Sequence, residues 1–187
     1  MKKSAQVHKG FTLVELLVVI AIIAILAAVV VLIINPLELT RRGRDAARLT
    51  DLANLQQAIN VAVQEATNSG QNIACNGGGA TCNSSSTAGT RATNGGGWVM
   101  VNLGVQTSVS VPTLPVDPTN SVGDIGYHYA YCGSGDNWEI FTKLESSQQS
   151  PKMTTDGGTN DNYYEVGSVI NLAGTGVGGG GNCLYSP

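Results

Sequence analysis

The sequence has little charge and few of the side chains that commonly serve in catalysis. Only 12% of its 187 residues are charged, and only two are histidines. From Asp51 onward three basic residues stand against ten acidic ones, so no basic surface is available there to hold phosphates. Nucleic acid is therefore not expected as a main partner.

An enzyme is not expected either, because neither histidine has the neighbours that a nucleophilic or metal site needs. His8 lies in a short basic segment at the N-terminus, and His128 lies in an aromatic stretch. His128 and Cys132 form the one possible dyad. A surface histidine beside a disulfide is the more ordinary interpretation of this pair.

Apolar residues are concentrated near the N-terminus. Residues 1–10 form a basic leader, and residues 11–34 form an apolar run of 24 residues. As a helix this run measures about 36 Å, enough to cross a bilayer, whereas a secretory signal has an apolar region of only about 7–15 residues. The sequence thus predicts a membrane span. Three lysines precede it and four arginines soon follow it, so positive charges alone do not orient it.

Asn35 and Pro36 end the apolar run and predict a kink or break in the helix. Residues 35–67 then have apolar positions every three or four residues, so one face is expected to be buried: Leu49, Leu52, Leu55, Ile59, Val63 and Ala66. Arg41 with Asp45, and Arg48 with Asp51, are expected to form ordinary pairs on the solvated face.

Four cysteines, all after the span, predict two disulfides in an oxidising compartment. Three pairings are possible. Cys75–Cys82 would close a small Gly/Asn loop, and Cys132–Cys183 would tie down a glycine-rich C-terminus, so we favour this combination. Zinc is disfavoured because the six-residue gap between Cys75 and Cys82 exceeds the usual spacing of ligands.

Residues 68–187 are expected to form one extracytoplasmic domain. A Gly/Ser/Asn-rich surface loop is predicted at 68–97, followed by strands at 98–103, 105–111, 127–131 and 137–145. The predicted fold class is therefore α+β, with a long N-terminal helix, part membrane span and part amphipathic, packed on a small antiparallel sheet. Asp156, Asn160 and Asp161 offer hard oxygen ligands that calcium would accept, although a solvated turn is the default interpretation of that loop.

The junction between leader and span carries the most specific pattern in the chain. It reads Lys9-Gly10-Phe11-Thr12-Leu13-Val14-Glu15 and continues at once into the apolar run. Here the chain resembles the type IV prepilins and type II secretion pseudopilins, and the strings at 114–120 and 138–146 look similar to pseudopilin G-like domains. The resemblance implies a pilin-like fold, cleavage by a prepilin peptidase between Gly10 and Phe11, and N-methylation of Phe11.

Glu15 is an ionisable residue at the start of an apolar span, where such residues usually have a partner. The α-amino group that cleavage creates on Phe11 of a neighbouring copy could neutralise it and set the register of assembly. Alternatively, Glu15 could simply reach water at the membrane edge.

The predicted function is that of a structural subunit of a type IV pilus or a secretion pseudopilus. Its expected partners are identical or related pilin subunits, the prepilin peptidase and an inner-membrane assembly platform. The precursor is expected in the cytoplasmic membrane with its leader inside, and the mature chain in an extracytoplasmic or cell-surface filament. The alternative is a membrane-anchored extracytoplasmic ligand-binding module that keeps its leader and does not polymerise.

Overall fold

The computed structural model describes residues 10–66, 73–76, 81–104, 111–122 and 126–173. They form two α-helices, four strands and one short 3-10 helix, in the order α1 (Leu13–Ile34), α2 (Pro36–Ala66), β1 (Thr81–Ser85), β2 (Ala130–Ser134), β3 (Asn137–Thr142), η1 (Ser150–Thr154) and β4 (Tyr164–Gly167). The chain divides into two compact units, Met1–Thr40 and Arg41–Pro187. The predicted α+β class, with a long apolar helix and a second helix on a small antiparallel sheet, is confirmed.

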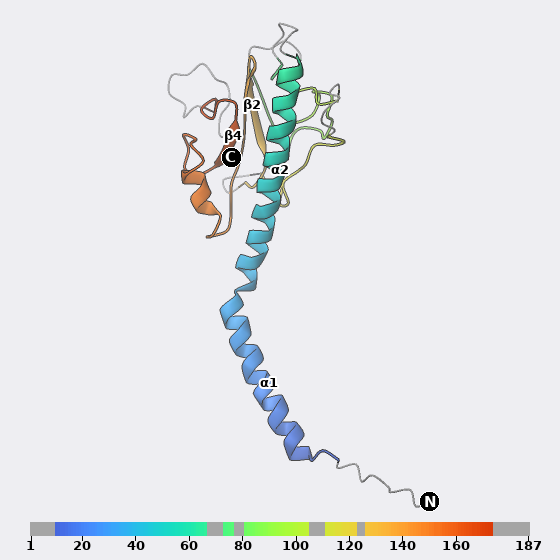
Figure 1. The fold of residues 1–187 in the computed structure, drawn as a ribbon, viewed down its shortest axis with the longest axis vertical. Helices are drawn as coiled ribbons and strands as arrows, with labels where there is room; N and C mark the ends of the chain where they lie inside the picture. Colours follow the sequence, from blue (N-terminus) through green and yellow to red (C-terminus); the bar gives the residue numbers. More distant parts are fainter. Residues whose placement is uncertain (1–9, 67–72, 77–80, 105–110, 123–125, 174–187) are drawn as a thin grey trace, which may run out of the picture. The chain divides into compact units, whose positions relative to one another are not determined.

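Helix α1 is apolar on every side. None of its 22 residues is buried within the chain. At 1.5 Å per residue it measures about 33 Å, close to the thickness of a bilayer's hydrocarbon core. Among the described residues it is the single helix long and apolar enough to cross a membrane. Figure 1 shows it as the blue helix that follows the N-terminus.

The predicted break after the apolar run is present at Asn35. This residue has a left-handed backbone, with φ 40°, and ends α1. Pro36 is the first residue of α2, a position at which its missing N–H costs nothing. The side-chain Oδ1 of Asn35 accepts a hydrogen bond from the backbone N–H of Glu38 at 3.4 Å. Asn35 thus ends one helix and caps the next.

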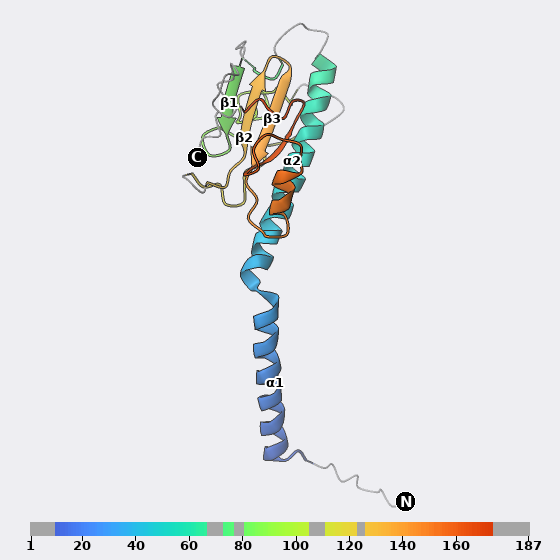
Figure 2. The same ribbon diagram turned by 90° about the vertical axis from the view of Figure 1, so that its left-hand side faces the viewer.

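The core of the second unit lies between α2 and the sheet, which run alongside each other in both views (Figure 1, Figure 2). From α2 it takes the predicted apolar face, with Leu52, Leu55 and Ile59 almost completely buried. The sheet and the segment before it supply the facing side chains: Tyr129, Tyr131, Trp138, Ile140 and Val166. The sheet is antiparallel throughout, in the order β1-β2-β3-β4.

The predicted strands are only partly right. The strand predicted at 137–145 is present over its first six residues as β3, and the one at 127–131 overlaps β2 at its last two residues. The strand predicted at 98–103 is wrong, because its backbone pairs with the preceding loop instead of the sheet. Trp98 N–H donates to Thr90 O at 2.9 Å, and Leu103 N–H donates to Thr93 O at 2.7 Å. Its side chains still enter the core, with Trp98 and Leu103 buried.

Two strands were not predicted. β1 lies within the segment predicted as a surface loop, and β4 follows the candidate calcium loop. β1 has no apolar alternation, since its residues are half-buried or exposed, and it is held by backbone pairing with β2 at the edge of the sheet. Most of the strand predicted at 105–111, the C-terminal tail from 174, and residues 67–72 and 77–80 lie outside the described residues.

Candidate functional site

The predicted cleavage junction lies just outside the first helix. Gly10, Phe11 and Thr12 precede α1, and Thr12 has extended backbone angles of φ −82° and ψ 152°. Phe11 is 86% exposed, and a Cβ added to Gly10 would meet no atom within 4 Å. The Gly10–Phe11 peptide bond is therefore accessible and free of helical hydrogen bonding, which is the condition of a chain segment open to a protease.

Thr12 and Glu15 form a capping box at the start of α1. The Oε2 atom of Glu15 accepts from the Thr12 backbone N–H at 2.8 Å and from the Thr12 hydroxyl at 2.7 Å. In return, the Thr12 hydroxyl oxygen accepts from the backbone N–H of Glu15 at 3.3 Å. This reciprocal pairing satisfies backbone donors that the first turn of a helix leaves open. It also holds the Glu15 carboxylate at the N-terminal end of the helix.

Thr12 was not predicted as a functional residue. Its signal is present in the sequence, because Thr12-Leu13-Val14-Glu15 fits the pattern of a capping box, a serine or threonine followed three residues later by glutamate. The same four residues thus define both where the helix begins and where the carboxylate lies. The predicted roles of Gly10, Phe11 and Glu15 in cleavage, methylation and assembly stay predictions.

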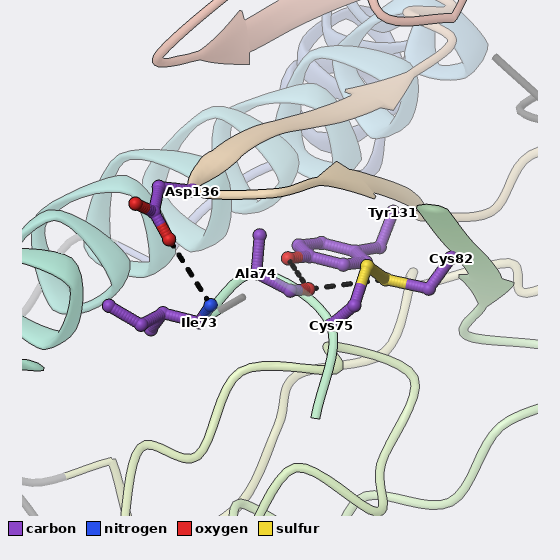
Figure 3. Close-up of a disulfide and its surroundings, with 6 residues drawn as sticks. All are labelled: Ile73, Ala74, Cys75, Cys82, Tyr131 and Asp136. Carbon is purple, nitrogen blue, oxygen red and sulfur yellow. Dashed lines mark hydrogen bonds between the residues drawn. A yellow bond between two sulfur atoms is a disulfide. The ribbon is translucent and has the colours of Figure 1, made fainter. Parts of the chain in front are cut away.

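A disulfide joins Cys75 and Cys82, the pairing favoured from the sequence. Figure 3 shows it beside the ring of Tyr131, whose hydroxyl donates to the carbonyl of Ala74 at 2.6 Å. A Cβ on Gly133 of β2 would lie 2.8 Å and 3.0 Å from the two sulfurs, so only glycine leaves room for the bond to pack on the strand. The disulfide therefore fastens the turn at 73–76 to the edge strand β1.

Cys132 also takes part in a disulfide. Its predicted partner, Cys183, lies outside the described residues, so the Cys132–Cys183 pairing stays a prediction. A disulfide sulfur is not a thiolate nucleophile, and the possible dyad with His128 is therefore not formed. The Nδ1 atom of His128 instead lies 3.3 Å from the carbonyl of Ser121.

Two of the candidate calcium residues, Asp156 and Asn160, accept hydrogen bonds from nearby backbone N–H groups. The Asp156 carboxylate accepts from the N–H groups of Gly158 at 2.9 Å and Glu165 at 2.8 Å. Asn160 Oδ1 accepts from the N–H of Asn162 at 3.1 Å, and Asp161 is exposed. Within the described part of the chain, no three His, Cys, Asp or Glu side chains are arranged to hold a metal. Calcium binding at this loop stays a prediction.

The pairing predicted for Arg48 is wrong. Arg48 is completely buried and does not form a surface pair with Asp51. Its guanidinium donates to Asp117 through Nε at 2.6 Å and Nη2 at 2.9 Å, and to Asp45 and Glu145 through Nη1 at 2.9 Å and 2.6 Å. Asp117 and Glu145 are 69 and 97 residues away in the sequence, which is why spacing along the helix could not identify them.

This cluster joins three segments of the second unit. The Asp45 carboxylate also accepts from the backbone N–H groups of Glu145 and Ser146, while Asp117 accepts from those of Thr119 and Asn120. Burial lowers the pKa of Arg48, but the hydrogen bonds and charges of its three carboxylate partners outweigh burial and raise its pKa above the usual value. The arginine is therefore a permanent cation that fastens both loops to α2.

Comparison with known protein families matches residues 6–31 to the prokaryotic N-terminal methylation motif. Comparisons with curated proteins and with solved structures gave no match. The matched residues include the Gly10–Phe11 junction, the Thr12–Glu15 capping box and most of α1. The N-terminal part of this chain thus carries the prepilin-type signature of the type IV pilins and pseudopilins.

Proposed function

We propose that this protein is a filament subunit that is cleaved between Gly10 and Phe11 and polymerises through α1. The observation that carries the proposal is that α1 consists of apolar residues apart from Glu15 and buries none of them within its own chain. Such a surface is stable in a lipid bilayer or against other apolar helices, but not in water. The methylation motif at the N-terminal end of α1 favours a helix that leaves the membrane and packs against other apolar helices in a filament.

Glu15 is proposed to pair with the Phe11 amine of a neighbouring copy. Cleavage leaves a positive α-amino group four residues before Glu15, on a chain end that lies outside the helix. Thr12 holds the Oε2 atom of Glu15, so an incoming amine would meet a carboxylate that is already oriented. Opposite charges attract strongly in an apolar surrounding, and the pair would therefore define the stagger between adjacent helices.

The first experiment is intact mass analysis with N-terminal sequencing of the chain from its native membrane. We expect a chain that starts at Phe11, with an added methyl group on its amine. A chain that starts at Met1 would contradict the proposal and favour a static membrane anchor that presents a ligand-binding domain.

Assembly is tested separately with Glu15→Ala. We expect this variant to be cleaved but to yield no sheared filaments in electron micrographs, because the Phe11 amine then has no carboxylate to meet. Glu65→Ala, which removes an exposed carboxylate at the end of α2, is the matched control and should assemble normally. Normal filaments from Glu15→Ala would refute the pairing while leaving the cleavage proposal intact.

A further inference from the structure

Two carboxyl side chains lie next to each other on the face of the sheet that points away from α2. In the register of β3 and β4, Glu139 is opposite Gly167 and Phe141 is opposite Glu165. Glu139 and Glu165 are therefore diagonal neighbours on one face, within reach of each other's long side chains. Glu139 is completely buried and Glu165 is only 2% exposed. Two ionised carboxylates in such a place would repel each other strongly.

The hydrogen bonds of Glu139 are incomplete. Its Oε2 atom accepts from the backbone N–H of Ala173 at 2.8 Å, whereas its buried Oε1 atom has no partner among the described residues. Glu165 Oε2 accepts from the backbone N–H of Asn160 at 3.1 Å. A buried oxygen without a donor is costly, and a proton on Glu139 removes that cost by making the oxygen a donor toward Glu165.

The titratable groups around the pair do not neutralise Glu139. Cys132 is opposite Glu139 on β2, but it is in a disulfide and does not titrate. The loop before β4 contributes another acid, Asp156, whose carboxylate accepts from the backbone N–H of Glu165. Lys152 of η1 is exposed and lines the pocket that contains Asp156 and Glu165.

Tyr163 is a further titratable residue near Glu139 and Glu165. Its ring packs edge-on against Phe141, with 5.5 Å between the ring centres. Burial first, and then the neighbouring Glu165, raises the pKa of Glu139 to about 8.

We propose that Glu139 is protonated at neutral pH and donates its proton to Glu165, and that this single proton joins β3 to β4 on the outer face of the sheet. The proton turns two repelling anions into a hydrogen bond and gives Oε1 its missing partner. When the proton is lost to solvent at higher pH, the two carboxylates repel and the pairing of β4 with β3 is weakened.

The sign of the pH dependence follows from linkage. In the unfolded chain Glu139 ionises around its ordinary pKa of 4.5, and in the folded chain at about 8. Folding therefore takes up one proton between these values. The stability that the proton contributes is complete below pH 4.5, falls as the pH rises, and is lost above pH 8. One proton corresponds to an unfolding constant that rises about tenfold per pH unit in this window.

The test compares the full chain with Glu139→Gln, both in detergent micelles with a chelator, by denaturant unfolding from pH 5 to pH 9. Trp98 and Trp138 are buried in the second unit and report its unfolding by fluorescence. The introduced glutamine would keep the shape and the donor but cannot ionise. We expect the unfolding constant of the natural chain, relative to Glu139→Gln, to rise by up to about tenfold per pH unit. Glu65→Gln is the exposed control and should follow the natural chain.

Hydrogen exchange at the backbone amides of β4 tests the link itself. We expect their protection to fall between pH 7 and pH 9 in the natural chain and to persist in Glu139→Gln. Parallel pH dependences in the two proteins would overturn the proposal. If Glu139→Gln does not fold, Glu165→Gln replaces it, and a natural chain whose stability is flat from pH 5 to pH 8 overturns the proposal by itself.

Discussion

Replacing Arg48 by methionine should destabilise the second unit more than any other single change of a charged residue in α2. The guanidinium is completely buried among three carboxylates, with its Nε and Nη2 atoms donating in parallel to Asp117. Methionine fills part of the space but leaves Asp45 and Asp117 buried without a counter-charge. Removing one partner of a buried ion pair typically costs about 3–5 kcal/mol.

The lower end of that range applies here, because both carboxylates keep other donors. Asp45 still accepts from the N–H groups of Glu145 and Ser146, and Asp117 from those of Thr119 and Asn120. We therefore expect a loss of about 3 kcal/mol. For a unit of this size, that loss lowers the melting temperature by roughly 6–12 °C.

The assay is thermal unfolding of the full chain in detergent micelles, followed by tryptophan fluorescence. Arg44→Met is the matched control, because Arg44 pairs with the same Glu145 but has a side chain that is 30% exposed. Its melting temperature should fall much less. If Arg48→Met melts within about 2 °C of the natural chain, the cluster does not stabilise the fold as we infer.

Three further outcomes are expected. Gly133→Ala should lower the melting temperature, because the new Cβ would overlap both sulfurs of the Cys75–Cys82 disulfide; equal melting of the two proteins would show that the strand can shift. Thr12→Val should speed amide hydrogen exchange in the first turn of α1, whereas Thr12→Ser, which keeps the hydroxyl, should not. Millimolar calcium should raise the melting temperature if the loop at 156–161 binds it, and an unchanged value would remove that prediction.

The apolar helix α1 and the motif at its start could be predicted because their signals are local. A long run of apolar residues is removed from water in any fold, so it can be recognised from the sequence alone. The Asn-Pro pair restricts its own backbone, so the break between the two helices is also a local signal. The apolar face of α2 was equally readable from its spacing, and Leu52, Leu55 and Ile59 are indeed buried. The Cys75–Cys82 pairing followed from the shortness of the loop that it closes.

The sheet was less predictable, because strand pairing depends on partners far away in the sequence. The apolar residues at 98–103 satisfy a strand pattern, yet their backbone pairs with a neighbouring loop. β1 has no apolar alternation and is a strand because β2 lies beside it. A prediction from the sequence assigns strands by the preferences of their side chains. Whether a segment becomes a strand depends on which other backbone groups fold close enough to hydrogen-bond with it.

The sequence by itself determined that this protein has an apolar helix, a prepilin-type motif at its start and a second helix with one buried face. Each of these features depends on residues that are close together in the sequence and on the hydrophobic effect. Only the tertiary structure decided which charges are buried. Arg48 meets Asp117 and Glu145, and Glu139 meets Glu165, because folding brings distant segments together where water cannot screen or solvate their charges.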